Sequence, residues 1–421
     1  MVRHHEKIPA GLPERLTISF PIWGLYDTGS HGCYRDFDAM MREHTERGFN
    51  CIRLDDGAGL MHDLDGHRRQ PVLWGHAFGK YENCMRQFNS TGEGGYCDVH
   101  SRLIELFTAA KKHHIYIILS SWYYLHTCWF VKDRELNDRL HSIPPHQRFM
   151  AFARFLHYIL CELEDRGLDS QIAFAEIFNE ADGLRFVNGY GDENHLSDAE
   201  IAVFRKEHEE AIQWLRERHP AILFGFDSWT YYTDKRQIPG NMQVYNFHNY
   251  FLFSVYTNAI ENDMSLLRPH NRISIAEIKA ASDCAYPPTD DWYQRVWFYQ
   301  NLDENKIPAA CAKATDYLHT HMEEIRDRLR SSVEYLEETL THSLPPVPAV
   351  CGEGVSYCGG YTLVWEETSA DYWQLIQEMM AAYRKLGLWG TVVRTCCGPE
   401  DPVWTRCPEQ LLAANRAFLG K

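Results

Sequence analysis

The sequence predicts an α/β protein whose strands and helices close into a (β/α)8 TIM barrel. Short β-rich runs alternate with amphipathic helical patterns along the 421 residues, which is typical of a parallel sheet with right-handed crossovers. Eight such runs favour a closed barrel over an open sheet. No G-x-G-x-x-G turn follows any run, which disfavours a dinucleotide-binding fold. The predicted strands are 17–25, 49–54, 115–122, 172–180, 222–227, 243–250, 347–353 and 388–395.

Most segments between these strands have the spacing of helices that bury one face. Apolar side chains recur every three or four residues over 149–163, 201–215 and 372–383. Ser197 precedes the second of these segments and Glu200 follows three positions on, which is the capping box that favours a helix start. The connection after the fifth strand is short and poor in helical pattern.

We expect a single domain over residues 1–421 with two long loop insertions. One lies near 56–96, after the second strand, and is rich in Gly, His and Asp. The other lies near 251–310, after the sixth strand, is aromatic and leads into a long helix at 312–341. Loops that follow the carboxyl ends of the strands build the active site in such barrels. Both insertions should therefore border it.

Composition limits the partners and the compartment. The 42 basic and 58 acidic residues give a net charge of −16, so nucleic acid and anionic membrane surfaces are poor partners. No apolar run approaches the roughly 18 residues of a membrane span, and residues 1–18 hold no signal-peptide core. The 13 cysteines, an odd number, indicate reduced thiols. We expect a cytoplasmic protein; the alternative is a secreted one whose signal peptide has been removed.

Two predicted strands end in a carboxylate. The fourth reads I-A-F-A-E-I-F-N-E and ends at Asn179-Glu180, and the seventh reads V-P-A-V-C-G-E and ends at Glu353. In a closed barrel both strand ends open onto the same mouth. A carboxylic acid that faces a carboxylate is the arrangement that hydrolyses a glycosidic bond. We predict that Glu180 and Glu353 form the catalytic pair; the alternative is that they are unrelated loop carboxylates.

This pattern resembles the retaining (β/α)8 glycoside hydrolases of the clan that includes cellulases, and is most similar to cellulase-like members related to glycoside hydrolase family 5. The resemblance in strand order covers nearly the whole chain. It implies that Glu180 is the acid/base and that Glu353 is the nucleophile.

The resemblance also implies roles for four other strand-end residues. Asn179 would hydrogen-bond the sugar 2-hydroxyl, and Arg53, at the end of the second strand, would help to keep Glu353 ionised. His248 and Tyr250 would match the His-x-Tyr of the sixth strand, with the tyrosine hydroxyl near the nucleophile and the histidine near the sugar or the acid/base.

Alternatives remain open at some of these positions. Arg53 could be a structural partner of the inward-facing Glu176, alone or together with its role at the nucleophile. His248 could be a satisfied core histidine. Glu277, in I-S-I-A-E-I-K, could end a strand of its own, but we reject it as the nucleophile because it would leave an extra α/β unit.

Aromatic and acidic residues near other strand ends are candidate sugar contacts. Trp122 and Trp229 follow the third and fifth strands, and Asp227 ends the fifth. The resembled family commonly has a Trp near the end of the eighth strand, where this chain has Thr-Cys at 395–396. Trp404, in the loop that follows, is the expected replacement.

We predict no metal and no cofactor. The cysteines at 396, 397 and 407 lack C-x-x-C spacing, and the histidine pairs at 4–5 and 113–114 are adjacent, so their members do not share a helix face. The sequence contains neither a G-x-x-x-x-G-K-[ST] phosphate loop nor a G-x-S-x-G elbow.

The predicted function is retaining hydrolysis of β-glycosides by double displacement through a covalent glycosyl-enzyme. The expected partner is a carbohydrate, either a short β-linked oligosaccharide or a small glycoside, and walls built by the two insertions would favour exo action. A sugar-binding barrel that has lost catalysis is the alternative, because the third and eighth strand ends depart from the family pattern. A barrel hydrolase or lyase that uses a metal is a further alternative.

Overall fold

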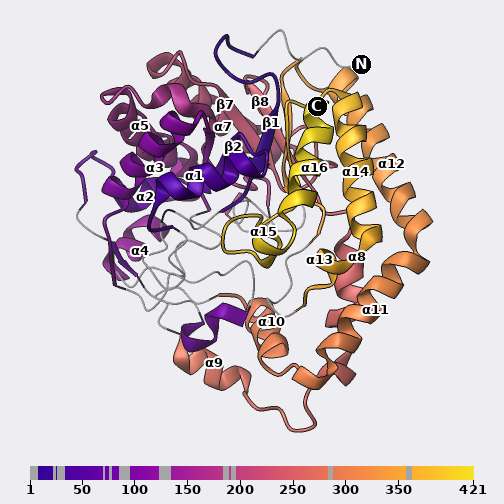
Figure 1. The fold of residues 1–421 in the computed structure, drawn as a ribbon. Helices are drawn as coiled ribbons and strands as arrows, with labels where there is room; N and C mark the ends of the chain where they lie inside the picture. The colour runs from indigo at the N-terminus through magenta and orange to yellow at the C-terminus, as the bar shows by residue number, and fades with distance from the viewer. Residues whose placement is uncertain are drawn as a thin grey trace.

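Eight parallel strands close into a barrel in the computed structural model (Figure 1). Around the barrel their order is β1-β10-β9-β8-β7-β6-β5-β2, while β3 and β4 form a separate hairpin. The structure describes residues 8–421 apart from 22–24, 26–33, 70–71, 75–77, 85–94, 123–133, 184–188, 191–195, 283–287 and 357–362. The barrel strands are β1 (Leu16–Ser19), β2 (Cys51–Asp55), β5 (Tyr116–Ser120), β6 (Ile172–Glu176), β7 (Phe224–Ser228), β8 (Val244–Asn249), β9 (Ala349–Gly354) and β10 (Gly390–Val392).

Each predicted strand is present, so the predicted fold class is confirmed. The strands are buried along almost their whole length, because helices cover the outside of the barrel and side chains fill its inside. Most are shorter than predicted. The run 172–180, for example, keeps its apolar alternation after the backbone has left the ladder at Glu176, and it ends at Glu180 with a left-handed φ of 51°.

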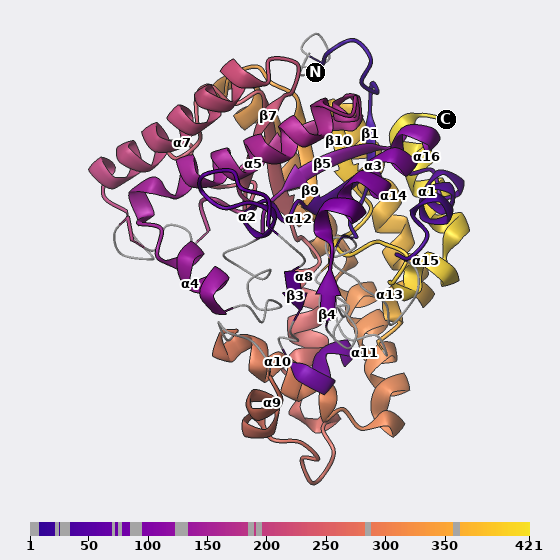
Figure 2. The same cartoon turned by 90° about the vertical axis from the view of Figure 1, so that its left-hand side faces the viewer.

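The helices lie on the outside of the barrel. In Figure 1, α5 and α7 lie on the side of the strands away from α12 and α14, and Figure 2 shows α7 and α14 on opposite sides. The predicted capping box starts α7: Ser197 Oγ accepts from the Glu200 N–H at 3.3 Å, and Glu200 Oε2 accepts from the Ser197 N–H at 2.7 Å. Among the described helices, none combines the length and apolar character that crossing a membrane requires. These outer helices are α1 (Phe37–Glu46), α3 (Val99–His113), α4 (Arg134–His141), α5 (Arg148–Glu164), α7 (Asp198–Arg218), α12 (Met322–Glu338), α13 (Trp365–Thr368), α14 (Ala370–Leu386), α15 (Pro402–Arg406) and α16 (Pro408–Leu419).

The segments that follow β2 and β8 contact one another. Gly79 has a φ of 57°, and a Cβ on it would lie 2.1 Å from the carbonyl oxygen of Ala281, so a side chain there would push the two backbones apart. Gln300 Nε2 also donates to the carbonyl of Tyr81 at 3.1 Å. The first segment contains α2 (Ala58–Met61), β3 (Val72–Trp74), the 3-10 helix η2 (Gly79–Cys84) and β4 (Gly95–Cys97), and the second contains α8 (Phe253–Tyr256), α9 (Ile275–Ala281), α10 (Asp290–Gln300) and the start of α11 (Ile307–Thr320).

The helix predicted over 312–341 is two helices, and this expectation was wrong. Helix α11 ends at Thr320 and α12 begins at Met322, with His321 between them. The His321 ring stacks on Tyr317 with 4.0 Å between centroids, and its Nδ1 lies 2.8 Å from the Tyr317 carbonyl oxygen. A side chain that bonds a carbonyl of the preceding turn competes with the helix, which accounts for the break.

Candidate active site

A cavity of about 920 Å³ opens at the carboxyl ends of the strands. This is the face on which (β/α)8 barrels bind their ligands, and the volume lies within the usual range of small-molecule sites. Its walls combine carboxylates with aromatic rings. Residues that line it include Trp122, Asn179, Glu180, Trp229, Tyr231, His248, Tyr250, Trp292 and Glu353.

Glu180 and Glu353 converge in this cavity from opposite parts of the chain. Glu353 ends β9, and Glu180 lies four residues beyond β6. One oxygen of each carboxyl group lies within 4.8 Å of the other. The Glu353 side chain is 8% exposed and that of Glu180 is 22% exposed, so both groups are largely enclosed but reach the cavity.

Both oxygens of Glu353 accept a hydrogen bond. Arg53 Nη1 donates to Oε1 at 2.8 Å, and the Tyr250 hydroxyl donates to Oε2 at 2.6 Å. Burial and the charge of Glu353 raise the pKa of Tyr250 well above its ordinary value, so the hydroxyl keeps its proton. These two contacts fix the side chain of Glu353 at the cavity and leave its oxygens as acceptors, as in an ionised carboxylate.

Glu180 lies in a different environment. Its carboxyl Oε1 accepts from His248 Nδ1 at 2.9 Å, and its backbone N–H donates to Asp227 Oδ1 at 3.2 Å. Burial raises the pKa of Glu180 to about 7, and the charge of Glu353 adds to this increase against the effect of the His248 hydrogen bond. A non-glycine residue with φ of 51° is strained, and such strain is characteristic of functional sites.

His248 links the two carboxylate environments. Its Nδ1 faces Glu180, and its Nε2 lies 3.1 Å from Asp227 Oδ1 and 3.5 Å from Glu353 Oε1. Burial alone would lower the pKa of His248, but the charges of Glu353 and Asp227 raise it well above its ordinary value. The side chain is buried, as the core-histidine alternative expects, yet it borders the cavity and carries a charge.

Arg53 joins the ends of four strands. Besides Glu353, it contacts Glu176 at 3.3 Å and Asp227, and its Nη2 donates to Asn179 Oδ1 at 2.9 Å. Its guanidinium carbon lies 4.4 Å from the centre of the Trp122 ring. Arg53 therefore contacts both partners that the sequence left open, the carboxylate of Glu353 at the cavity and the inward-facing one of Glu176.

The carboxyl groups of the buried polar cluster differ in their pKa values. Burial and the charge of Asp227 raise the pKa of Glu176 to about 8, so Glu176 and Glu180 both hold protons at mildly acidic pH. Burial would raise the pKa of Asp227, but the charges of His248 and Arg53 outweigh this and lower it. The cluster comprises Arg53, His248, Glu176, Glu180, Asp227 and Glu353.

Two predicted sugar contacts lie elsewhere, and these expectations were wrong. Asp227 is fully buried and is surrounded by Arg53, His248 and the backbone of Glu180, so it positions other groups instead of facing a ligand. Trp404 is 1% exposed on α15, where its ring stacks on Phe49 with 5.5 Å between centroids. It therefore contributes to the core and has no surface for a sugar.

The other predicted residues border the cavity, except Arg53, which is fully buried behind Glu353. Trp229 is 45% exposed there and offers an open ring face, whereas Trp122 and Asn179 are almost buried at its base. Sequence reasoning missed Trp292 and Arg295 of α10 and Arg328 of α12, which also line it. The aromatic composition of the second long segment was the available signal, but it did not indicate which of its residues reach the mouth.

A cation would fit poorly between the two carboxylates. Glu180, His248 and Glu353 offer ligand atoms within 4.8 Å of one another. However, both ring nitrogens of His248 face carboxylate oxygens, so the protonated ring has no lone pair to give. Arg53 already supplies a positive charge to Glu353 at 2.8 Å. The donor set therefore suits proton transfer better than metal binding.

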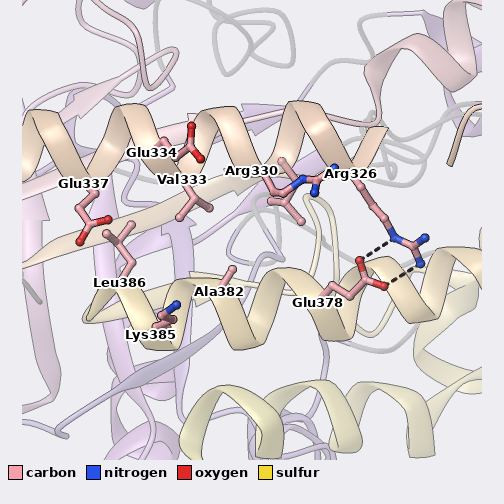
Figure 3. A pocket seen from close by; sticks show the side chains of 10 residues that line it. Arg326, Arg330, Val333, Glu334, Glu337, Glu378, Ala382, Lys385 and Leu386 are labelled. Carbon is pink, nitrogen blue, oxygen red and sulfur yellow. Dashed lines mark hydrogen bonds and ion pairs between the residues drawn. The ribbon is translucent and has the colours of Figure 1, made fainter. Parts of the chain in front are cut away.

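A second hollow, of about 570 Å³, lies between α12 and α14 on the outside of the barrel. Figure 3 shows Arg326 of α12 reaching across it to Glu378 of α14, with Nε and Nη2 donating at 3.0 and 2.8 Å. Arg326 and Glu378 form a conventional ion pair between helices, and this hollow lies outside the barrel instead of at the carboxyl ends of the strands. The cavity at the strand ends is therefore the candidate active site.

Comparisons with known proteins agree with this fold. Neither a family model nor a curated protein matches the chain. Among solved structures, it is similar to a protein from Parabacteroides distasonis described as a glycoside hydrolase, with 17% identity, a TM-score of 0.66 and coverage of 96% of this chain and 93% of that one. It is also similar to a glycoside hydrolase family 5 enzyme from Prevotella bryantii solved with a xyloglucan tetradecasaccharide, with 11% identity, a TM-score of 0.50 and 99% of each chain covered. A third similar structure is cellulose synthase subunit Z from Clostridioides difficile, with 10% identity, a TM-score of 0.50 and coverage of 95% of this chain and 99% of that one. The chain thus has the fold of cellulase-like (β/α)8 glycoside hydrolases, and the expected resemblance is confirmed at the level of the fold.

Proposed function

We propose that the protein is a retaining β-glycoside hydrolase in which the whole chain forms one catalytic domain. The observation that carries the proposal is the approach of Glu180 and Glu353 oxygens to within 4.8 Å in unlike environments. Retaining enzymes hold their two carboxyl groups about 5–5.5 Å apart, whereas inverting enzymes leave about 6.5–9.5 Å for a water molecule. The short separation therefore favours direct attack by one carboxylate.

In the first step, an oxygen of Glu353 attacks the anomeric carbon of the sugar while the bond to the leaving-group oxygen breaks. Glu180 gives its proton to that oxygen, so the leaving group departs as an alcohol. The pKa of Glu180, raised to about 7 mainly by burial, suits a group that must hold a proton near neutral pH. Arg53 and Tyr250 keep Glu353 in place for the attack.

In the second step, Glu180 takes a proton from water, whose oxygen attacks the anomeric carbon and releases the Glu353 carboxylate. The covalent intermediate itself prepares Glu180 for this change of role. Glu180 is a carboxylate at this point because it has given its proton to the leaving group, and Glu353 is neutral while it is esterified, so it no longer contributes to the raised pKa of Glu180. Two displacements at one carbon return the original configuration.

The proposed substrates are short β-linked oligosaccharides or small β-glycosides. Trp229, exposed at the rim, would stack on the flat face of a sugar ring, and Asn179 at the base would contact the sugar in the reacting position. The similar enzyme from Prevotella bryantii was solved with a xyloglucan tetradecasaccharide. Release of single terminal units would agree with exo action, and release of internal fragments would contradict it.

Nuclear magnetic resonance of the first-formed product tests the reaction class. The expected product of an aryl β-glycoside is the β-anomer before mutarotation, and Glu353→Gln should lower kcat by at least about 1,000-fold. Glu277→Gln is the matched control, because Glu277 is an exposed capping residue of α9 and should tolerate the change. An α-anomer would contradict the retaining mechanism. Saccharide binding without turnover would instead favour the inactive sugar-binding barrel.

A further inference from the structure

Three side chains with metal-ligating atoms meet between α5 and α7. His157 and Cys161 are four residues apart on α5, which places them on one helix face, and His219 directly follows α7. The Nδ1 of His157 lies 3.6 Å from Cys161 Sγ and 2.8 Å from His219 Nε2. The three ligand atoms all lie within 4.8 Å of one another.

These separations are close to those of a tetrahedral zinc site. Zinc–nitrogen bonds of about 2.0–2.1 Å and a zinc–sulfur bond of about 2.3 Å place two nitrogens about 3.3 Å apart, and nitrogen and sulfur about 3.6 Å apart. The distance between His157 and Cys161 already matches. The two histidine nitrogens would have to separate by about 0.5 Å, which a small rotation of the half-exposed His157 ring supplies.

A carboxylate orients the third ligand. His219 Nδ1 lies 2.7 Å from Glu164 Oε1, and an ionised carboxylate can only accept, so Nδ1 carries the proton. The lone pair of the neutral His219 ring is therefore on Nε2, which faces His157 and Cys161. This carboxylate–histidine arrangement is the usual second layer of protein zinc sites, where it fixes the tautomer of the ligand.

In a neighbouring cluster, the central histidine has no lone pair that faces the other possible ligands. His62, His100 and Glu162 also lie within ligand distance of one another. However, His100 Nδ1 is 2.8 Å from Glu162 Oε2 and its Nε2 is 2.9 Å from the carbonyl oxygen of Met61. Both ring nitrogens face oxygen acceptors, which leaves no lone pair for a metal. The comparison shows that grouped histidines alone do not make a site.

From this geometry we propose that His157, Cys161 and His219 form a structural zinc site, with water as the fourth ligand. His157 and Cys161 are half-buried, so an ion can reach them. The strands that follow these helices, β6 and β7, begin shortly after Cys161 and His219, so the site lies at the amino ends of the strands, away from the cavity. Binding would tie α5 to α7 and stabilise the fold without entering the reaction. This inference is independent of the proposed hydrolase activity.

Cobalt is the spectroscopic probe for this site. The full chain is first freed of metal with a chelator and should then bind one Co²⁺. Binding should produce a thiolate-to-metal charge-transfer band and the intense visible bands of tetrahedral cobalt. Zn²⁺ should displace the Co²⁺. Cys161→Ser should abolish the charge-transfer band, and Zn²⁺ should raise the Tm of the wild type but not of this variant. Cys311→Ser is the matched control, because Cys311 is another half-buried helix cysteine outside the cluster.

Glu164→Gln separates a metal site from a simple hydrogen-bond chain. Loss of the orienting carboxylate should weaken Co²⁺ binding by about 10- to 100-fold while the charge-transfer band at saturation remains. Absence of the band in the wild type would overturn the proposal, as would its persistence in Cys161→Ser. If Cys161→Ser does not fold by circular dichroism, His157→Gln replaces it, and it should weaken Co²⁺ binding and remove the increase in Tm caused by Zn²⁺. Equal effects of Cys161→Ser and Cys311→Ser would also count against the site.

Discussion

Glu180 and Glu353 are the same kind of side chain with different neighbours. Glu353 accepts hydrogen bonds from Arg53 and Tyr250, while Glu180 accepts one from His248 and is the more exposed of the two carboxyl groups. Such a pair divides naturally into a nucleophile and an acid, because the environment of each group favours a different protonation state.

The pH dependence of hydrolysis tests the role of Glu180. Its pKa of about 7 lies above the ordinary value of 4.5, mainly because of burial, so the acid form is lost as the pH rises through 7. We expect kcat/KM for a substrate with a poor leaving group to fall about tenfold per pH unit on the alkaline side. The folded state binds this proton more tightly than the unfolded state does. The contribution of Glu180 to the free energy of unfolding should therefore fall as the pH rises from 4.5 to 7.

A glycoside whose leaving group needs no proton supplies the control. With such a substrate, Glu180→Gln should keep a measurable first step, and neither the variant nor the wild type should show the alkaline limb near pH 7, because the first step then needs no proton from Glu180. An unchanged limb in Glu180→Gln would assign the pKa to another residue.

Strand-end residues could be predicted from the sequence because the topology decides where they go. Residues at the carboxyl end of any barrel strand reach the same mouth, so Glu180 and Glu353 could be paired across the chain. Trp404 could not be assigned in this way, since a flat apolar ring suits core packing and sugar stacking equally. Trp292 and Arg295 lie on α10, whose position depends on how a long segment docks.

At the scale of elements, the end of β9 is built around glycine. Gly354 follows Glu353 with a φ of 154°, and a Cβ on it would lie 2.5 Å from the carbonyl oxygen of Asn249 on β8. The adjacent strand therefore fixes the backbone that carries the proposed nucleophile. Val355 continues with a φ of 72°, an uncommon conformation for a β-branched residue.

Gly354→Ala should lower both stability and activity. Backbone strain and the overlap with Asn249 together predict a loss of about 3 kcal/mol or more in the free energy of unfolding, measured with urea. Gly167→Ala is the control, because Gly167 has a φ of 62° but no atom within 4 Å of its Cβ position, so we expect only about 1–2 kcal/mol. Equal losses in the two variants would contradict the packing argument at β9.

The eight barrel strands could be predicted because strands covered on both faces appear in the sequence as short apolar runs with β-branched residues. Their ends were less certain, since the apolar pattern continues beyond β6 while the backbone turns away. The three-residue strands β3 and β4 are too short to leave a pattern. The break at His321 depends on the contact of its Nδ1 with the Tyr317 carbonyl oxygen, which the apolar periodicity does not contain.

At the scale of the whole molecule, one buried cation connects distant parts of the chain. Arg53 of β2 contacts Glu176 of β6, Asp227 of β7 and Glu353 of β9. Taking Arg53 away would remove the guanidinium that these buried carboxyl groups share, which costs far more than losing a surface pair.

Arg53→Met should therefore lower the free energy of unfolding by about 3–5 kcal/mol. Arg326→Met removes the ion pair with Glu378 between α12 and α14, where the arginine side chain is 25% exposed, and should cost about 1 kcal/mol or less. Urea denaturation of both variants at neutral pH gives the comparison. A similar small loss in both would mean that the buried cluster does not hold the strand ends together.

The identity of the residue that attacks the sugar is the central claim, and covalent trapping tests it most directly. A 2-deoxy-2-fluoro β-glycoside with a good leaving group should inactivate the enzyme and add the mass of one fluorosugar to the peptide that contains Glu353. An adduct on another residue, or rapid turnover of other β-glycosides with no adduct at all, would contradict the assignment.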